Sequence, residues 1–157
     1  MRKPPDKPLA LIGIGNSGRK DDGLGWAFLD QLAQKNPPAD LHYRYQLQIE
    51  DAELIARYEQ VIFIDAHRGE LQGGYSLSPL QPSPVAGFTT HQLSPGALLY
   101  LCENLYQSHP EAQVLAIAGQ DWGLGLGLSA AARQNLRRAL QIVTDGFGFS
   151  PAILDFS

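Results

Sequence analysis

The sequence predicts an α/β protein built on a twisted, mostly parallel sheet of about five strands, with helices on both faces. Two observations lead to this class. Short apolar runs, typical of strands buried on both faces, recur at residues 9–14, 61–64 and 114–118. Segments with helical spacing of apolar residues separate these runs. Such alternation of strands and helices is typical of a parallel sheet between two helix layers.

The first helix is expected to follow the glycine-rich end of the strand at 9–14. Leu24, Phe28 and Leu32 recur at helical spacing, so they share one face that turns toward the core. One of the two aspartates at 21–22 is expected to cap its N-terminus. The Asn-Pro-Pro sequence at 36–38 ends it.

The middle of the chain adds three strands. Apolar and polar residues alternate over 41–49, which indicates a half-buried strand, and a brief helix is expected at 51–58. The buried strand at 61–64 ends on Asp65. A glycine pair and three prolines over 73–84 indicate an edge hairpin or edge strand.

Two further helices have recognisable starts. Ser94, followed by a proline, predicts a cap and first turn, and Ser129 is expected to cap the last long helix. Within the helix after Ser94, Cys102 shares the apolar phase of Leu98 and Leu105. Cys102 is therefore expected in the core.

Composition indicates one domain over residues 1–157, with residues 1–8 as a flexible arm. Hydrophobic residues make up 44% of the chain and charged residues 18%, as in globular proteins. The net charge of −4, without a Lys and Arg cluster, argues against nucleic-acid binding. No segment approaches the roughly 20 apolar residues of a membrane span. The N-terminus does not resemble a signal peptide, and the lone Cys102 suits a reducing compartment, so we expect a cytoplasmic protein.

Polar side chains follow several of the predicted strands. Because ligands bind beyond the carboxyl ends of the strands in such sheets, these loops are the candidate site. The candidates are Asn16, Asp21 and Asp22 after the first strand, Asp65, His67 and Arg68 after the third, His91 and Gln92 before Ser94, and Gln120 and Asp121 after the last strand. Carboxylates and an imidazole are thus expected at one edge.

Three kinds of site fit these residues to different degrees. Residues 13–18 match G-x-G-x-x-G, the pattern of a dinucleotide-binding loop, but the two aspartates that follow would repel a phosphate. A phosphoryl-receiver domain would need its acids nearer the strand end and a lysine after the last strand. Asp22, Asp65 and His91 instead suit nickel, zinc or a similar ion, with coordination positions left open.

Each of these three residues also has a structural explanation. Asp22 is explained by a helix cap, Asp65 by bonds to nearby backbone amides, and His91 by a turn before Ser94. His67 is a candidate fourth ligand but is expected to be solvated or in an outer shell, and Asp121 is a minor candidate in a flexible loop.

Four segments together resemble the nickel-iron hydrogenase maturation endopeptidases. They are "GIGNSGRKDDGLG", "VIFIDA", "TTHQLSPG" and "GLGLS", in this order, and the resemblance extends from residue 9 to about residue 143. It implies a metal-dependent endopeptidase that trims a C-terminal extension from the hydrogenase large-subunit precursor after nickel insertion. The metal-contacting positions of the family correspond to Asp22, Asp65 and His91, which are therefore the expected catalytic residues.

The resemblance also implies that the nickel is supplied by the precursor and that the resting protein is metal-free. The expected partner is the precursor, with neither nucleic acid nor membrane involved, and the protein is expected to be a monomer. Asn16 and its neighbouring glycines are expected to let the precursor tail approach the backbone. His67 and Arg68 depart from the family pattern, which suggests a role in precursor choice. A non-enzymatic nickel- or nucleotide-binding α/β module is the alternative.

Overall fold

The computed structural model describes residues 8–84 and 93–144, and its centre is a five-stranded sheet of order β2-β1-β3-β5-β4. The strands are β1 Leu9–Ile14, β2 Asp40–Arg44, β3 Gln60–Arg68, β4 Tyr75–Pro79 and β5 Glu111–Gly119. All neighbouring pairs are parallel except β4 and β5, so the edge strand β4 is antiparallel. The predicted class and the predicted edge strand are confirmed. The expected N-terminal arm lies, apart from Pro8, outside the described residues.

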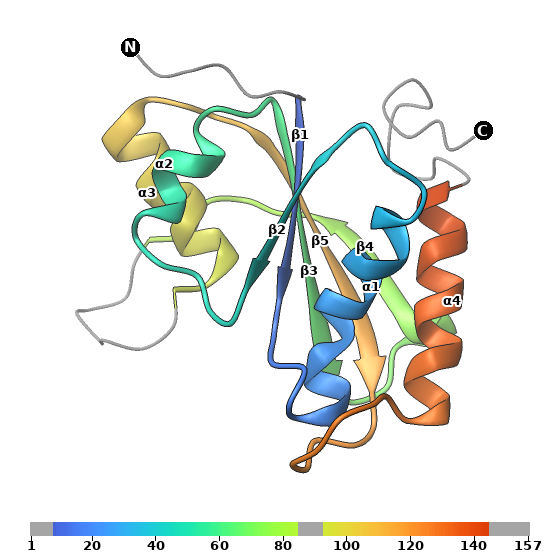
Figure 1. The fold of residues 1–157 in the computed structure, drawn as a ribbon. Coiled ribbons are helices and arrows are strands. Elements are labelled where there is room, and N and C mark those ends of the chain that lie inside the picture. Colours follow the sequence, from blue (N-terminus) through green and yellow to red (C-terminus); the bar gives the residue numbers. More distant parts are fainter. Residues whose placement is uncertain (1–7, 85–92, 145–157) are drawn as a thin grey trace.

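Helices cover both faces of this sheet (Figure 1). One face is covered by α1 (Leu24–Ala33) and α4 (Ala130–Thr144), and the other by α2 (Asp51–Ile55) and α3 (Pro95–Tyr106). Two short 3-10 helices, η1 (Lys20–Gly23) and η2 (Gln72–Gly74), precede α1 and β4. Within the described part of the chain, no helix is long and apolar enough to cross a membrane.

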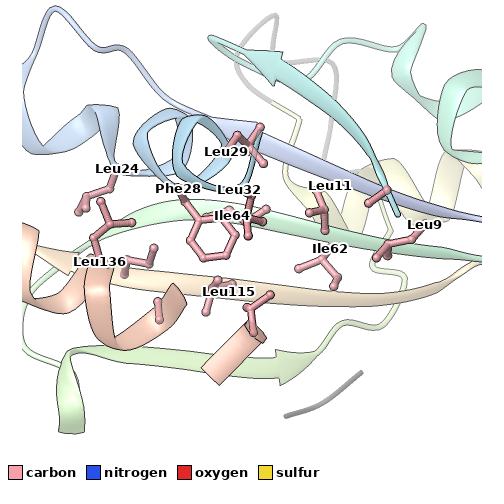
Figure 2. Packing of buried hydrophobic residues seen from close by; sticks show 14 of the residues in the cluster. Leu9, Leu11, Leu24, Phe28, Leu29, Leu32, Ile62, Ile64, Leu115 and Leu136 are labelled. Carbon is pink, nitrogen blue, oxygen red and sulfur yellow. The ribbon is translucent and has the colours of Figure 1, made fainter. Parts of the chain in front are cut away.

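The central strands alternate their side chains between two hydrophobic clusters. Leu11 and Ile64 join Phe28 of α1 on one face (Figure 2), whereas Ile12 and Phe63 pack under α2 and α3 on the other. Both faces are buried, which is why the strands appear in the sequence as continuous apolar runs. The expected inner face of α1 is confirmed, since Leu24, Phe28 and Leu32 are at most 1% exposed.

Two serine caps are confirmed and one predicted cap is wrong. The Oγ atoms of Ser94 and Ser129 accept hydrogen bonds from the amides of Ala97 (3.0 Å) and Ala132 (3.1 Å). Neither Asp21 nor Asp22 caps α1, because both lie in η1, the extra turn that precedes the helix.

Several element boundaries differ from the expectation. The second strand ends at Arg44, where its partner β1 also ends, although the alternating pattern continues to Ile49. Tyr45 and Ile49 are consequently exposed. Conversely, β3 continues to Arg68, because β5 remains beside it. Cys102 is fully buried as predicted, but Leu105, in the last turn of α3, is 54% exposed.

Helix α1 packs close to the end of β1 and the middle of β3, and Gly25 allows this. A Cβ atom at Gly25 would lie 2.5 Å from the carbonyl oxygen of Ile64 and 2.7 Å from that of Ile14. Both obstacles are backbone atoms of central strands, which cannot move as a flexible side chain would. The absence of a side chain at Gly25 therefore lets the helix that follows the candidate site lie close against the sheet.

We expect Gly25→Ala to lower the free energy of unfolding by about 3 kcal/mol, because the added methyl group overpacks this contact. Urea unfolding followed by circular dichroism measures the loss. Gly123→Ala is the matched control, since its added Cβ would have a nearest neighbour at 3.5 Å, the Oδ1 atom of Asp121. Equal losses in both variants would show that the close approach at Gly25 is not important for stability.

Candidate functional site

The candidate site lies where the connections of the sheet change direction. From β1 the chain crosses to β2 on one side, and β3 then pairs with the other side of β1. Loops leaving neighbouring strands in opposite directions open a crevice at the carboxyl edge. Asp22, in η1 after β1, and Asp65, near the end of β3, both belong to this crevice.

Asp65 is a half-buried carboxylate that no cation among the described residues pairs with. Burial raises its pKa to about 6, the hydrogen bond from the amide of Ala66 (2.8 Å) opposes this rise, and the negative charge of Asp22 adds to it. The repulsion from Asp22 shows that the two carboxylates lie close enough to interact. The hydrogen bond from a backbone amide that a purely structural Asp65 would need is also present, but it occupies only the Oδ1 atom.

Asp22 is fixed by the loop that precedes it. Its Oδ2 accepts a hydrogen bond from the amide of Asn16 (3.0 Å). Gly15 has a φ of +147°, and its missing Cβ would lie 2.0 Å from the carbonyl oxygen of Asp22. The absence of a side chain at Gly15 thus lets the backbone of Asp22 approach closely, and the expected approach of a precursor tail to this loop stays a prediction. Among the described residues, none donates a hydrogen bond to Oδ1 of Asp22 or to Oδ2 of Asp65.

Asp21, next to Asp22, has a different role that sequence reasoning missed. It is fully buried, and its carboxylate accepts from the amides of Gln120 (2.7 Å), Asp121 (2.8 Å) and Ser129 (2.7 Å) and from the Ser129 hydroxyl (2.7 Å). Burial alone would raise the pKa of Asp21, but these hydrogen bonds outweigh burial and lower it. Asp21 therefore ties the loop between β5 and α4 to the loop that bears Asp22.

Solved structures of hydrogenase maturation endopeptidases have this architecture. The hydrogenase maturating endopeptidase HybD from E. coli superposes with a TM-score of 0.70 at 16% identity, over 87% of this chain and 90% of that one. The hydrogenase 2 maturation peptidase from Thaumarchaeota archaeon SCGC_AB-539-E09 gives 0.66 at 23% identity, over 92% and 100%. The hydrogenase maturation protease HycI from Thermococcus kodakarensis KOD1 gives 0.67 at 19% identity, over 87% and 90%.

The chain has the hydrogenase maturation endopeptidase fold. This confirms the fold that the sequence motifs implied. At these identities the likeness establishes the fold alone. No model of a sequence family matches the chain, nor does any protein of curated function.

In this hydrogenase maturation endopeptidase fold, the glycine-rich loop is not built to hold a phosphate. A phosphate cradle needs free backbone N–H groups. Here seven loop amides donate to oxygens of the protein itself. The donors are the amides of Gly15, Asn16, Gly18, Arg19, Lys20, Asp21 and Asp22. These hydrogen bonds disfavour the dinucleotide interpretation of G-x-G-x-x-G, and with it a nucleotide-binding module.

The third predicted ligand, His91, lies outside the described residues. Leu93, two positions later, forms a β-bridge with Leu47. Leu47 and Leu93 both belong to the cluster under α2 and α3, the face to which strand alternation assigns Asp65. Within residues 8–84 and 93–144, no three His, Cys, Asp or Glu side chains converge, so the Asp22, Asp65 and His91 set stays a prediction.

The remaining candidates lie around the carboxylates. His67 is half-buried and, two residues after Asp65 on the same strand, points to the same face. The Arg68 guanidinium lies 4.4 Å from the centre of the Trp122 ring. Asp121, a minor ligand candidate, pairs instead with Lys20 (3.1 Å). This ion pair links the same two loops that Asp21 joins.

Proposed function

We propose that this protein is an endopeptidase that removes a C-terminal extension from the nickel-loaded precursor of a nickel-iron hydrogenase large subunit. One observation carries the proposal: Asp22 and Asp65 lie at the switch point of a sheet with the hydrogenase maturation endopeptidase fold, and their charges interact there. The motifs that resemble this family in the sequence contain the same two residues.

The chemistry of the pair favours a divalent cation. Two neighbouring carboxylates in a half-buried crevice repel each other, and each has an oxygen to which no described residue donates a hydrogen bond. A bound cation would remove the repulsion. In the proposed complex Asp22, Asp65 and His91 would contact the nickel of the precursor, and the ion would supply Lewis-acid chemistry for hydrolysis of the scissile bond.

We propose that the nickel enters with the substrate. Two carboxylates and one imidazole leave an ion incompletely coordinated, and the precursor would complete its shell. Cleavage would then report that nickel has been inserted. The proposed setting is the cytoplasm, where the fully buried thiol of Cys102 would stay reduced, and the proposed acting form is a monomer.

The test is a cleavage assay on nickel-loaded and nickel-free precursor, analysed by mass spectrometry. We expect only the loaded precursor to lose a defined C-terminal peptide. Cleavage of both forms would keep the peptidase and contradict the nickel requirement. Nickel-dependent binding without cleavage of either form would favour the non-enzymatic alternative.

A further inference from the structure

Two leucines next to the candidate site are exposed to solvent. Residues 123–127, here called the leucine loop, have the sequence Gly-Leu-Gly-Leu-Gly and lie between β5 and α4. Leu124 is 78% exposed and Leu126 84%. The tip of this loop carries no polar or charged side chain. Two leucines exposed within three positions contribute little to the core and form an exposed apolar patch.

The leucine loop is fixed in place by the loop that bears Asp22. The amide of Gly125 donates to the carbonyl of Gly18 (2.9 Å), and the amide of Lys20 donates to the carbonyl of Gly125 (3.0 Å). The bonds to Asp21 hold the chain on both sides of this point. The leucine loop is therefore attached at its centre to the loop that bears Asp22, rather than forming a loosely attached segment.

We propose that the leucine loop docks an apolar segment of the polypeptide substrate next to the bond to be cleaved. This inference rests on the proposed peptidase function. Residues 123–127 carry no charged side chain, and the neighbouring Lys20 is already paired with Asp121 (3.1 Å), so an apolar occupant fits this loop better than a charged one. A polypeptide fits because the N–H groups of Leu124 and Leu126 donate to no atom of the described chain, so an extended segment can pair with them. The bridge between Gly125 and Arg19 places the occupant beside the loop that bears Asp22.

The test is steady-state cleavage of the nickel-loaded precursor by the double variant Leu124→Ser, Leu126→Ser. In the proposed complex the two leucines would be buried against the substrate. Losing these contacts is expected to raise KM by at least about tenfold, with kcat changed less than about twofold. Leu105→Ser is the matched control, because Leu105 is also an exposed leucine (54%) but lies on α3. Its KM should equal that of the unchanged protein.

Each other result has a separate meaning. An unchanged KM in the double variant, with normal cleavage by the unchanged protein, overturns the docking proposal and leaves the peptidase intact. A change in molecular mass by light scattering, without a change in KM, assigns the leucines to an interface between two copies. Binding to phospholipid vesicles that the double variant alone loses assigns them to a membrane surface. Absence of cleavage by the unchanged protein overturns both the function and the docking proposal.

Discussion

Asp65→Asn is expected to abolish precursor cleavage while making the free protein more stable at neutral pH. In the proposed mechanism the carboxylate contacts the nickel of the precursor, and an amide is a much poorer ligand. The rate of cleavage should fall at least about 100-fold, which corresponds to about 3 kcal/mol of transition-state stabilisation. Activity and stability would then change in opposite directions at one residue.

The gain in stability follows from the pKa of Asp65, which is raised to about 6 mainly by burial. A carboxyl in the unfolded chain titrates near 4. Because the folded carboxyl keeps its proton to higher pH, stability present below about pH 4 is lost as the pH rises through about 6. At pH 7.5 the cost is about 2 to 3 kcal/mol. Asparagine avoids it and can still accept the hydrogen bond from the Ala66 amide.

Urea unfolding at pH 4.5 and at pH 7.5 checks this result. The variant should exceed the unchanged protein in stability at pH 7.5 by about 2 to 3 kcal/mol, and by much less at pH 4.5. Glu70→Gln is the control, since it also replaces a carboxylate by an amide, but at an exposed residue that follows the end of β3. A stability difference independent of pH would contradict the burial argument, and normal cleavage would remove Asp65 from the mechanism.

Asp21→Asn is expected to destabilise the fold by about 3 to 5 kcal/mol, because an amide cannot accept all four hydrogen bonds of this fully buried carboxylate. The three amides that donate to it would compete for one oxygen. The lowered pKa of Asp21 means that its contribution is present above about pH 4 and is lost only as the pH falls through the folded value. Thermal or urea unfolding at pH 7.5 measures the loss.

Asp22→Asn is the matched comparison for Asp21→Asn. The side chain of Asp22 is half-buried and accepts one hydrogen bond, from Asn16, so its stability should change by less than about 1 kcal/mol. Cleavage, in contrast, should be lost while the protein remains folded. If Asp22→Asn unfolded the protein as strongly as Asp21→Asn, the division of roles between the two neighbours would be wrong.

Secondary structure could be predicted where a single element determines the pattern. Continuous apolar runs identified β1 and the cores of β3 and β5, and Ser94 and Ser129 marked two helix starts correctly. Prediction failed where the neighbouring strand sets the length of a strand. The second strand ends where β1 ends, and β3 continues because β5 does, and neither limit can be seen in the local sequence.

The candidate site divides in the same way. Sequence placed Asp22 and Asp65 at one edge, because loops after parallel strands must meet there. It did not distinguish Asp21 from Asp22, which differ by one position in a 3-10 turn. That turn sends Asp21 into the β5–α4 loop and leaves Asp22 in the crevice.

By itself, the sequence determined the α/β class, the order of most elements and the carboxyl edge as the place of the chemistry, since hydrophobic periodicity and chain connectivity are local properties. Only the tertiary structure decided which carboxylate supports the fold and which faces the crevice, and that most amides of the glycine-rich loop donate to oxygens of the protein itself. These outcomes depend on hydrogen-bond partners about 100 residues apart in the chain, such as Asp21 and Gln120. Burial and pairing across such separations are set by packing, which local sequence patterns do not encode.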